Sequence, residues 1–186
     1  MKTIINDITT EYEIKNSRFI TILLKINDNF NLNNIMNEIK EKYPKATHYC
    51  YSYRTLYTQK SSDDGEPGGT AGIPMLNVLI KEDIINVLAV TVRYFGGIKL
   101  GAGGLVRAYT KSLTTALENV EYKYLEEGYL VKIEIDYKDQ KQLDYLLKDN
   151  NIISKEFNEK IEYLVEIKDI NQITQYNPKI IEKRLI

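Results

Sequence analysis

The alternation of apolar and polar positions predicts a mixed α and β fold over the first 120 residues. Residues 11–26, EYEIKNSRFITILLKI, alternate and predict two strands that meet near Asn16 and Ser17. Apolar residues in 32–43 recur at helical spacing, and that pattern stops at Pro44. The further predicted elements are a strand at 46–57, a helix at 70–81 that Thr70 opens, a buried strand at 85–95 and a helix at 103–120.

The pattern of apolar and polar positions changes at Gly128. Strand patterns at 129–137, 152–157, 160–168 and 179–186 alternate with a helix at 138–150 and a weak helix from Ile170 to Tyr176. This βαββαβ order is typical of a ferredoxin-like domain. The fold class is therefore predicted to be α+β with two domains, an N-terminal α/β sandwich at 1–127 and a small domain at 128–186.

Composition and charge exclude several classes of function. The chain carries 25 basic and 26 acidic residues, so a net charge of -1 excludes a polybasic nucleic-acid binder but leaves room for a local basic patch. One cysteine and one histidine exclude an internal disulfide and a four-coordinate zinc site of sulfur and nitrogen ligands. The N-terminus lacks a signal-peptide pattern, and the longest apolar run, 84–92, is too short to span a membrane. We therefore expect a cytoplasmic protein with no membrane partner, structural metal or cofactor.

Glycine and arginine are concentrated in one basic segment. Nine of the ten glycines lie between Gly65 and Gly104, and residues 92–111 predict a buried strand, a glycine-rich loop and a helix with no acidic residue. Helix N-termini attract anions, but the Walker A and dinucleotide-binding patterns are both absent. The segment predicts a phosphate or carboxylate site; the alternative is that the glycines only build a tight turn. The candidate anion-binding or nucleic-acid-binding residues are Arg54, Arg93, Gly96, Gly97, Lys99, Gly101, Gly103, Gly104, Arg107 and Lys111.

An acidic loop precedes the helix at 70–81. Three carboxylates fall within six positions, a density that suits a hard cation or acid–base chemistry. They could equally pair with the arginines of the glycine-rich segment, or form a solvated turn with Thr70 as the helix cap. The residues of this loop are Asp63, Asp64, Gly65 and Glu66.

Tyrosines line one face of the strand at 46–57, because alternate strand residues share a face. A tyrosine row beside basic groups could stack nucleobases, and a structural ladder is the alternative. The opposite face carries His48, Cys50, Ser52 and Arg54. No third group is placed to orient a Cys–His pair, so Cys50 is predicted not to be catalytic. The candidate stacking residues are Tyr49, Tyr51, Tyr53 and Tyr94.

Four motifs resemble the YigZ/IMPACT family. They are EIKNSRFI, HYCYSYR, SDDGEPGGTAGIP and VTVRYFGGIKLGAGGLVRAYTKSL, within the first 120 residues. Gly68 stands where the family often has serine, and the part after Gly128 resembles the second domain of bacterial members more weakly. The resemblance implies an N-terminal fold like the second domain of a small-subunit ribosomal protein and the fourth domain of elongation factor G. It implies a C-terminal fold like the fifth domain of elongation factor G.

The resemblance also implies a function. The eukaryotic IMPACT relatives regulate translation through the co-activator of a kinase of an initiation factor, and a nucleic-acid or ribosome-linked role is suggested for bacterial members. We therefore expect a non-catalytic, translation-linked regulator that binds RNA, the ribosome or a ribosome-associated protein through the glycine-rich basic loop. The alternatives are an enzyme acting on a small phosphorylated or carboxylated substrate through Asp63, Asp64 or Glu66, and a protein-interaction module. An enclosed pocket would favour the enzyme, and no protease motif is present.

Overall fold

The computed structural model describes residues 1–186, which divide into two compact units, Met1–Tyr124 and Leu125–Ile186. The sequence placed the boundary between residues 127 and 128. Both units combine helices with antiparallel sheets, so the predicted α+β class with two domains is confirmed. Each unit has a hydrophobic core of its own. No helix of the chain is long and apolar enough to cross a membrane.

A five-stranded antiparallel sheet forms the centre of the N-terminal unit, in the order β2-β3-β6-β4-β5. The predicted strands are present, but β1, β5 and β7 were not predicted, because three or four residues are too few to show a period. Strands β1 and β7 pair as a separate two-stranded sheet. The strands are β1 (Lys2–Ile4), β2 (Ile8–Ile14), β3 (Ser17–Lys25), β4 (His48–Arg54), β5 (Gln59–Ser62), β6 (Val87–Tyr94) and β7 (Tyr122–Tyr124).

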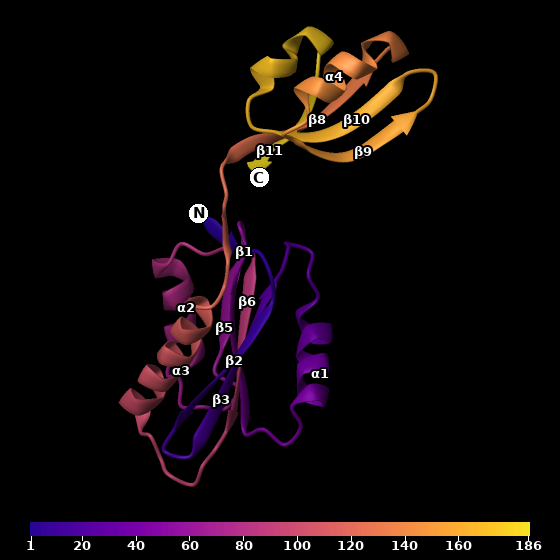
Figure 1. Ribbon diagram of the computed structural model, residues 1–186. Coiled ribbons are helices and arrows are strands. Elements are labelled where there is room, and N and C mark those ends of the chain that lie inside the picture. Colours follow the sequence, from indigo (N-terminus) through magenta and orange to yellow (C-terminus); the bar gives the residue numbers. More distant parts are fainter. The chain divides into compact units, whose positions relative to one another are not determined.

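Helices cover both faces of this sheet (Figure 1). Helices α2 (Gly72–Lys81) and α3 (Ala102–Leu117) pack on one face, where Ala89 of β6 joins the core. Helix α1 (Leu32–Lys42) packs on the other face, against Leu88 and Val90. Strand β6 is therefore buried on both sides, which explains its nearly continuous apolar sequence. The loop from β6 to α3 lies at one end of the sheet, beside the turn between β2 and β3 (Figure 1).

The C-terminal unit is a four-stranded antiparallel sheet in the order β11-β8-β10-β9. With helical segments after β8 and β10, this is the predicted βαββαβ arrangement, except that the second helix is a 3₁₀ helix. The elements are β8 (Glu127–Ile135), η1 (Tyr137–Asp139), α4 (Gln140–Leu146), β9 (Asn151–Phe157), β10 (Ile161–Ile167), η2 (Ile170–Tyr176) and β11 (Lys179–Leu185).

Candidate functional site: a pocket at the start of helix α3

The glycine-rich loop connects β6 to the N-terminus of α3. Gly101 is the residue before the helix and has a φ of 71°, a conformation that glycine adopts without strain. No side chain caps α3, and the first backbone bond of the helix runs from the N–H of Leu105 to the carbonyl of Gly101. The N–H groups of residues 102–104 therefore remain as donors, with the positive end of the helix dipole behind them.

A pocket of about 400 Å³ lies beside this helix start. Its walls are mainly apolar, and a few polar and charged groups converge on it, as in small-ligand sites. We call it the β6–α3 pocket. It is lined by Thr47, His48, Glu66, Pro67, Arg93, Phe95, Lys99, Leu100, Gly101, Ala102 and Leu105.

A buried ion pair forms the inner part of the pocket. Arg93 Nη1 donates to Glu66 Oε1 at 2.6 Å, and the two side chains are only 5% and 3% exposed. The Tyr109 hydroxyl donates to the same oxygen at 2.8 Å. Arg93 was predicted to belong to an open anion-binding surface, and this prediction is wrong because its charge is already balanced by Glu66. The sequence left open that the acidic loop pairs with an arginine. Glu66 forms such a pair with Arg93.

The side chain of Asp63 caps the N-terminus of helix α2, which begins nine residues later in the sequence. Its Oδ1 accepts hydrogen bonds from the N–H groups of Ala71 and Gly72 at 3.0 and 2.8 Å, and its Oδ2 accepts from Gly69 at 2.7 Å. Partial burial opposes ionisation, but these bonds outweigh it and lower the pKa of Asp63 below its ordinary value. The prediction that Thr70 caps this helix is wrong, because its hydroxyl donates to the Pro67 carbonyl instead.

Asp64 orients the only histidine. Its carboxylate accepts a hydrogen bond from the N–H of Tyr49 at 2.6 Å, and its carbonyl oxygen lies 2.8 Å from His48 Nδ1. The turn that brings it there includes Gly65, with a φ of 84°. Asp63, Asp64 and Glu66 therefore have three separate structural partners, and the expectation that they form one cluster of oxygen ligands is not supported.

The other basic residues predicted for the anion site lie in two separate regions of the N-terminal unit. Lys99 and Arg107 are exposed near the start of α3 and form no ion pair, and Lys111, one turn further on, lies 4.0 Å from Glu118. Arg54 lies at the far end of β4, where it contacts Asp83 and the Ile84 carbonyl at 3.4 Å. The grouping of Arg54 with the glycine-rich loop is therefore wrong, because β4 separates them by its whole length.

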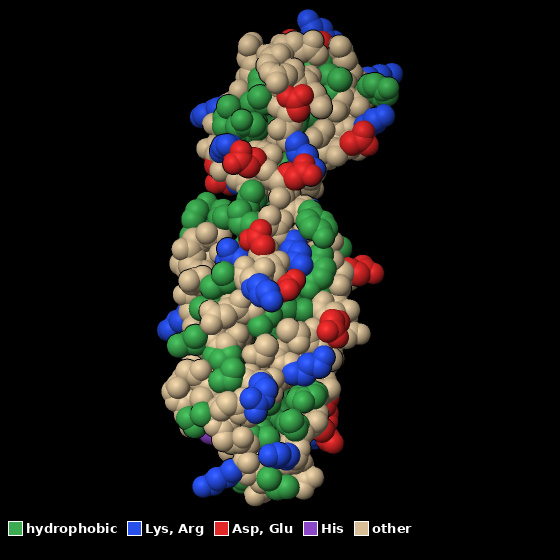
Figure 2. Space-filling model, turned by 90° about the vertical axis from the view of Figure 1, so that its left-hand side faces the viewer, with side chains coloured by type: hydrophobic (Ala, Val, Ile, Leu, Met, Phe, Trp, Pro, Cys, Tyr) green, Lys and Arg blue, Asp and Glu red, His purple; other side chains and the backbone are tan.

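The sequence did not show that a further cation approaches this region. Gly96 packs directly against the backbone of Asn16, in the turn between β2 and β3, which places the exposed Lys15 beside the glycine-rich loop. Only tertiary contact brings residues 15 and 96 together. Figure 2 shows the side of the N-terminal unit that carries α2 and α3, and Lys and Arg side chains are spread over its lower part with few acidic groups among them.

The tyrosine row lies on the sheet face that α1 covers. Tyr49, Tyr51 and Tyr53 pack against that core, and Tyr53 meets Phe30 edge to face with ring centroids 4.9 Å apart. Tyr94, on the same side, donates from its hydroxyl to the Pro44 carbonyl at 3.2 Å. These contacts favour the structural ladder over the base-stacking interpretation. Phe95, which the sequence did not single out, is the aromatic residue that lines the pocket.

Cys50 is expected to be unreactive in the folded protein. It is fully buried, its Sγ lies 3.0 Å from the Asp63 carbonyl and 3.2 Å from the Tyr109 hydroxyl, and burial raises its pKa to about 12. Since only the thiolate is nucleophilic, iodoacetamide at pH 8 should modify the native chain far more slowly than the chain in urea. Mass spectrometry of the alkylated Cys50 peptide measures this, and equal rates in both states would contradict the burial.

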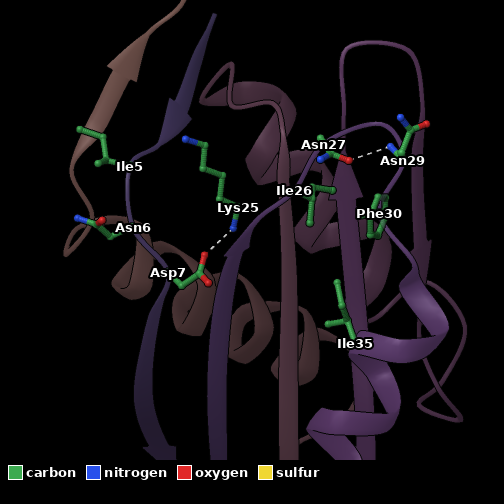
Figure 3. A pocket seen from close by; sticks show the side chains of 9 residues that line it. All are labelled: Ile5, Asn6, Asp7, Lys25, Ile26, Asn27, Asn29, Phe30 and Ile35. Carbon is green, nitrogen blue, oxygen red and sulfur yellow. Dashed lines mark hydrogen bonds between the residues drawn. The ribbon is translucent and has the colours of Figure 1, made fainter. Parts of the chain in front are cut away.

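A second, more open pocket of about 660 Å³ lies at the other end of the sheet (Figure 3). Two of its polar side chains bond to backbone: Asp7 accepts from the backbone N–H of Lys25 at 2.7 Å, and Asn27 accepts from the N–H of Asn29 at 2.9 Å. No candidate residue from the sequence lies here. The β6–α3 pocket is therefore the better candidate site.

Fold and site together define a two-domain α+β protein whose glycine-rich loop and buried Glu66–Arg93 pair frame a pocket at a helix N-terminus. The family model for the Impact N-terminal domain matches residues 15–117, more than half of the chain. The chain belongs to the IMPACT family, as its motifs indicated. Every motif that carried the resemblance overlaps the matched range.

Relatives and solved structures agree with this assignment. IMPACT family member YvyE of Bacillus subtilis is 36% identical over 173 residues, which are 89% of this chain and 80% of the relative. IMPACT family member YigZ of Escherichia coli is 40% identical over 118 residues, 61% of this chain and 58% of the relative. A crystal structure of a hypothetical protein covers 94% of this chain and 88% of its own, with a TM-score of 0.69 and 29% identity.

Proposed function

We propose that this chain is a non-catalytic, translation-linked regulator that binds RNA at the start of helix α3. The link to translation rests on membership of the IMPACT family and on the resemblance to its eukaryotic members. The binding mode rests on one observation: free helix N–H groups and the unpaired cations Lys15, Lys99 and Arg107 lie around one glycine-rich loop. Backbone donors and cations in this arrangement suit phosphate groups.

Binding to a short single-stranded RNA across a series of salt concentrations tests this proposal. Log affinity should fall linearly with log salt, with a slope of about 0.7 per phosphate neutralised. Each of Lys15→Ala, Lys99→Ala and Arg107→Ala should lower the slope by about that amount. Lys81→Ala, which removes an exposed lysine from the last turn of α2, is the matched control. A triple variant with unchanged affinity would refute RNA binding at this surface and favour a protein-interaction module.

The largely apolar lining of the pocket, with a few converging polar groups, favours a second candidate, an enzyme acting on a small phosphorylated or carboxylated substrate. Of the three acidic candidates only Glu66 lines the pocket, so Glu66 would carry the acid–base role. Turnover of a phosphomonoester or a carboxylic ester that Glu66→Gln abolishes, with the fold intact, would favour this candidate over the regulator.

A further inference from the structure

The inner end of the β6–α3 pocket holds two hydrogen-bond acceptors that face each other. His48 Nδ1 lies 2.8 Å from a carbonyl oxygen, which can only accept, so the proton of the neutral ring sits on Nδ1 and leaves Nε2 as an acceptor. Nε2 lies 3.8 Å from Glu66 Oε2, an oxygen that no hydrogen bond reaches. A ligand hydroxyl between them would donate to one of the two and a vicinal diol to both, whereas an apolar ligand would leave both acceptors without a donor.

A second group in the pocket also lacks a partner. Arg93 is 4% exposed, and its Nε forms no hydrogen bond although its two terminal nitrogens contact Glu66 and Ser17. The outer end of the pocket is different, because there Lys99 and the N-terminus of α3 present positive charge. The pocket thus combines two acceptors and an unpaired guanidinium N–H with an anion site at the start of α3.

The third feature of the pocket is an aromatic residue in its lining, Phe95. Phe95 is 45% exposed and lines the pocket together with Leu100 and Leu105, and its ring lies 5.5 Å from the Arg93 guanidinium, so this apolar lining can hold a flat group. Gly103 follows the pocket-lining Ala102 in the first turn of α3, and a Cβ there would meet no atom nearer than Arg107 Nη1 at 3.7 Å. The fold itself therefore does not require glycine at this position.

From these three features we infer that the β6–α3 pocket binds one ribonucleoside monophosphate unit, either a free nucleotide or one residue of an RNA chain. The phosphate lies at the N-terminus of α3 and Lys99, and the base lies against Phe95. A ribose hydroxyl donates to one of the two acceptors, Glu66 Oε2 or His48 Nε2, and the vicinal hydroxyl of a free nucleotide can donate to the other. This inference deepens the proposed function, since it adds recognition of the ribose to phosphate binding. It explains why an acidic side chain and a basic loop share one pocket.

Affinities for a short RNA, the DNA of the same sequence and free AMP test the inference on the full chain. A hydroxyl bonded to a buried charged group discriminates by roughly 1.5–3 kcal/mol, so RNA should bind about 10- to 100-fold more tightly than DNA. His48→Asn keeps a donor for the Asp64 carbonyl but removes Nε2, so the RNA preference should fall while the salt slope stays unchanged. Gly103→Ala should weaken both nucleic acids without lowering stability, and Gly68→Ala, in an exposed loop, is its control.

The outcomes separate the two proposals. Salt-dependent binding with equal affinity for RNA and DNA, unaffected by His48→Asn, overturns the pocket inference and leaves RNA binding standing. Binding of AMP that His48→Asn weakens, without binding of RNA, supports the pocket as a free-nucleotide site and refutes the proposed RNA function. Competition of AMP with RNA assigns both to the same pocket. Absence of binding to all three probes overturns both proposals.

Discussion

Replacing Arg93 by methionine should destabilise the N-terminal unit by about 3–5 kcal/mol, because it leaves the buried carboxylate of Glu66 without its counter-charge. Methionine roughly fills the volume of the arginine stem, so the loss would come from charge more than from packing. The remaining hydrogen bond of Glu66, accepted from the Tyr109 hydroxyl, cannot replace a full positive charge at 2.6 Å. Urea denaturation followed by circular dichroism measures the change.

A double-mutant cycle separates the charge effect from the rest. Glu66→Gln together with Arg93→Met removes both charges and keeps an acceptor for Tyr109, so the double variant should be more stable than Arg93→Met alone. Lys99→Met is the matched control, since that lysine is exposed and unpaired, and its effect should stay within about 0.5 kcal/mol. Equal effects of Arg93→Met and Lys99→Met would show that the ion pair contributes nothing to stability.

Alanine at Gly96 should have the second large effect. A Cβ built there falls 2.0 Å from the carbonyl carbon of Asn16 and 2.5 Å from the backbone nitrogen of Ser17. Both neighbours are backbone, so the turn between β2 and β3 has to move, and the cost should be about 3 kcal/mol, at the upper end of ordinary overpacking. The movement would also break the bond from the Gly96 N–H to Ser17 Oγ, which is 3.2 Å long.

Hydrogen exchange at residues 14–18, together with urea denaturation, measures the Gly96→Ala effect. Gly68→Ala is the control, because a Cβ at Gly68 meets nothing within 4 Å. If Gly96→Ala were as stable as Gly68→Ala, with unchanged exchange in the β2–β3 turn, the close approach of the two backbones would be refuted.

The sequence by itself determined most of the fold. Local periodicity is enough to define β6 as a doubly covered strand and to predict an amphipathic helix at 103–120, which the structure has at Ala102–Leu117, because both patterns repeat within one element. The βαββαβ order of the C-terminal unit followed in the same way. The family could also be identified from the sequence, because its two glycine motifs are contiguous stretches of chain.

The tertiary structure alone decided which side chains act together. Glu66 and Arg93 are 27 positions apart. No local pattern distinguishes Glu66, whose carboxylate neutralises an arginine, from Asp63, three residues earlier, whose carboxylate caps helix α2. The same holds for Lys15, which reaches the glycine-rich loop only because Gly96 admits the backbone of Asn16. Pairing of charges depends on distance in space, and the register of β3, β4 and β6 sets that distance, so the pocket could be located only after the sheet was assembled.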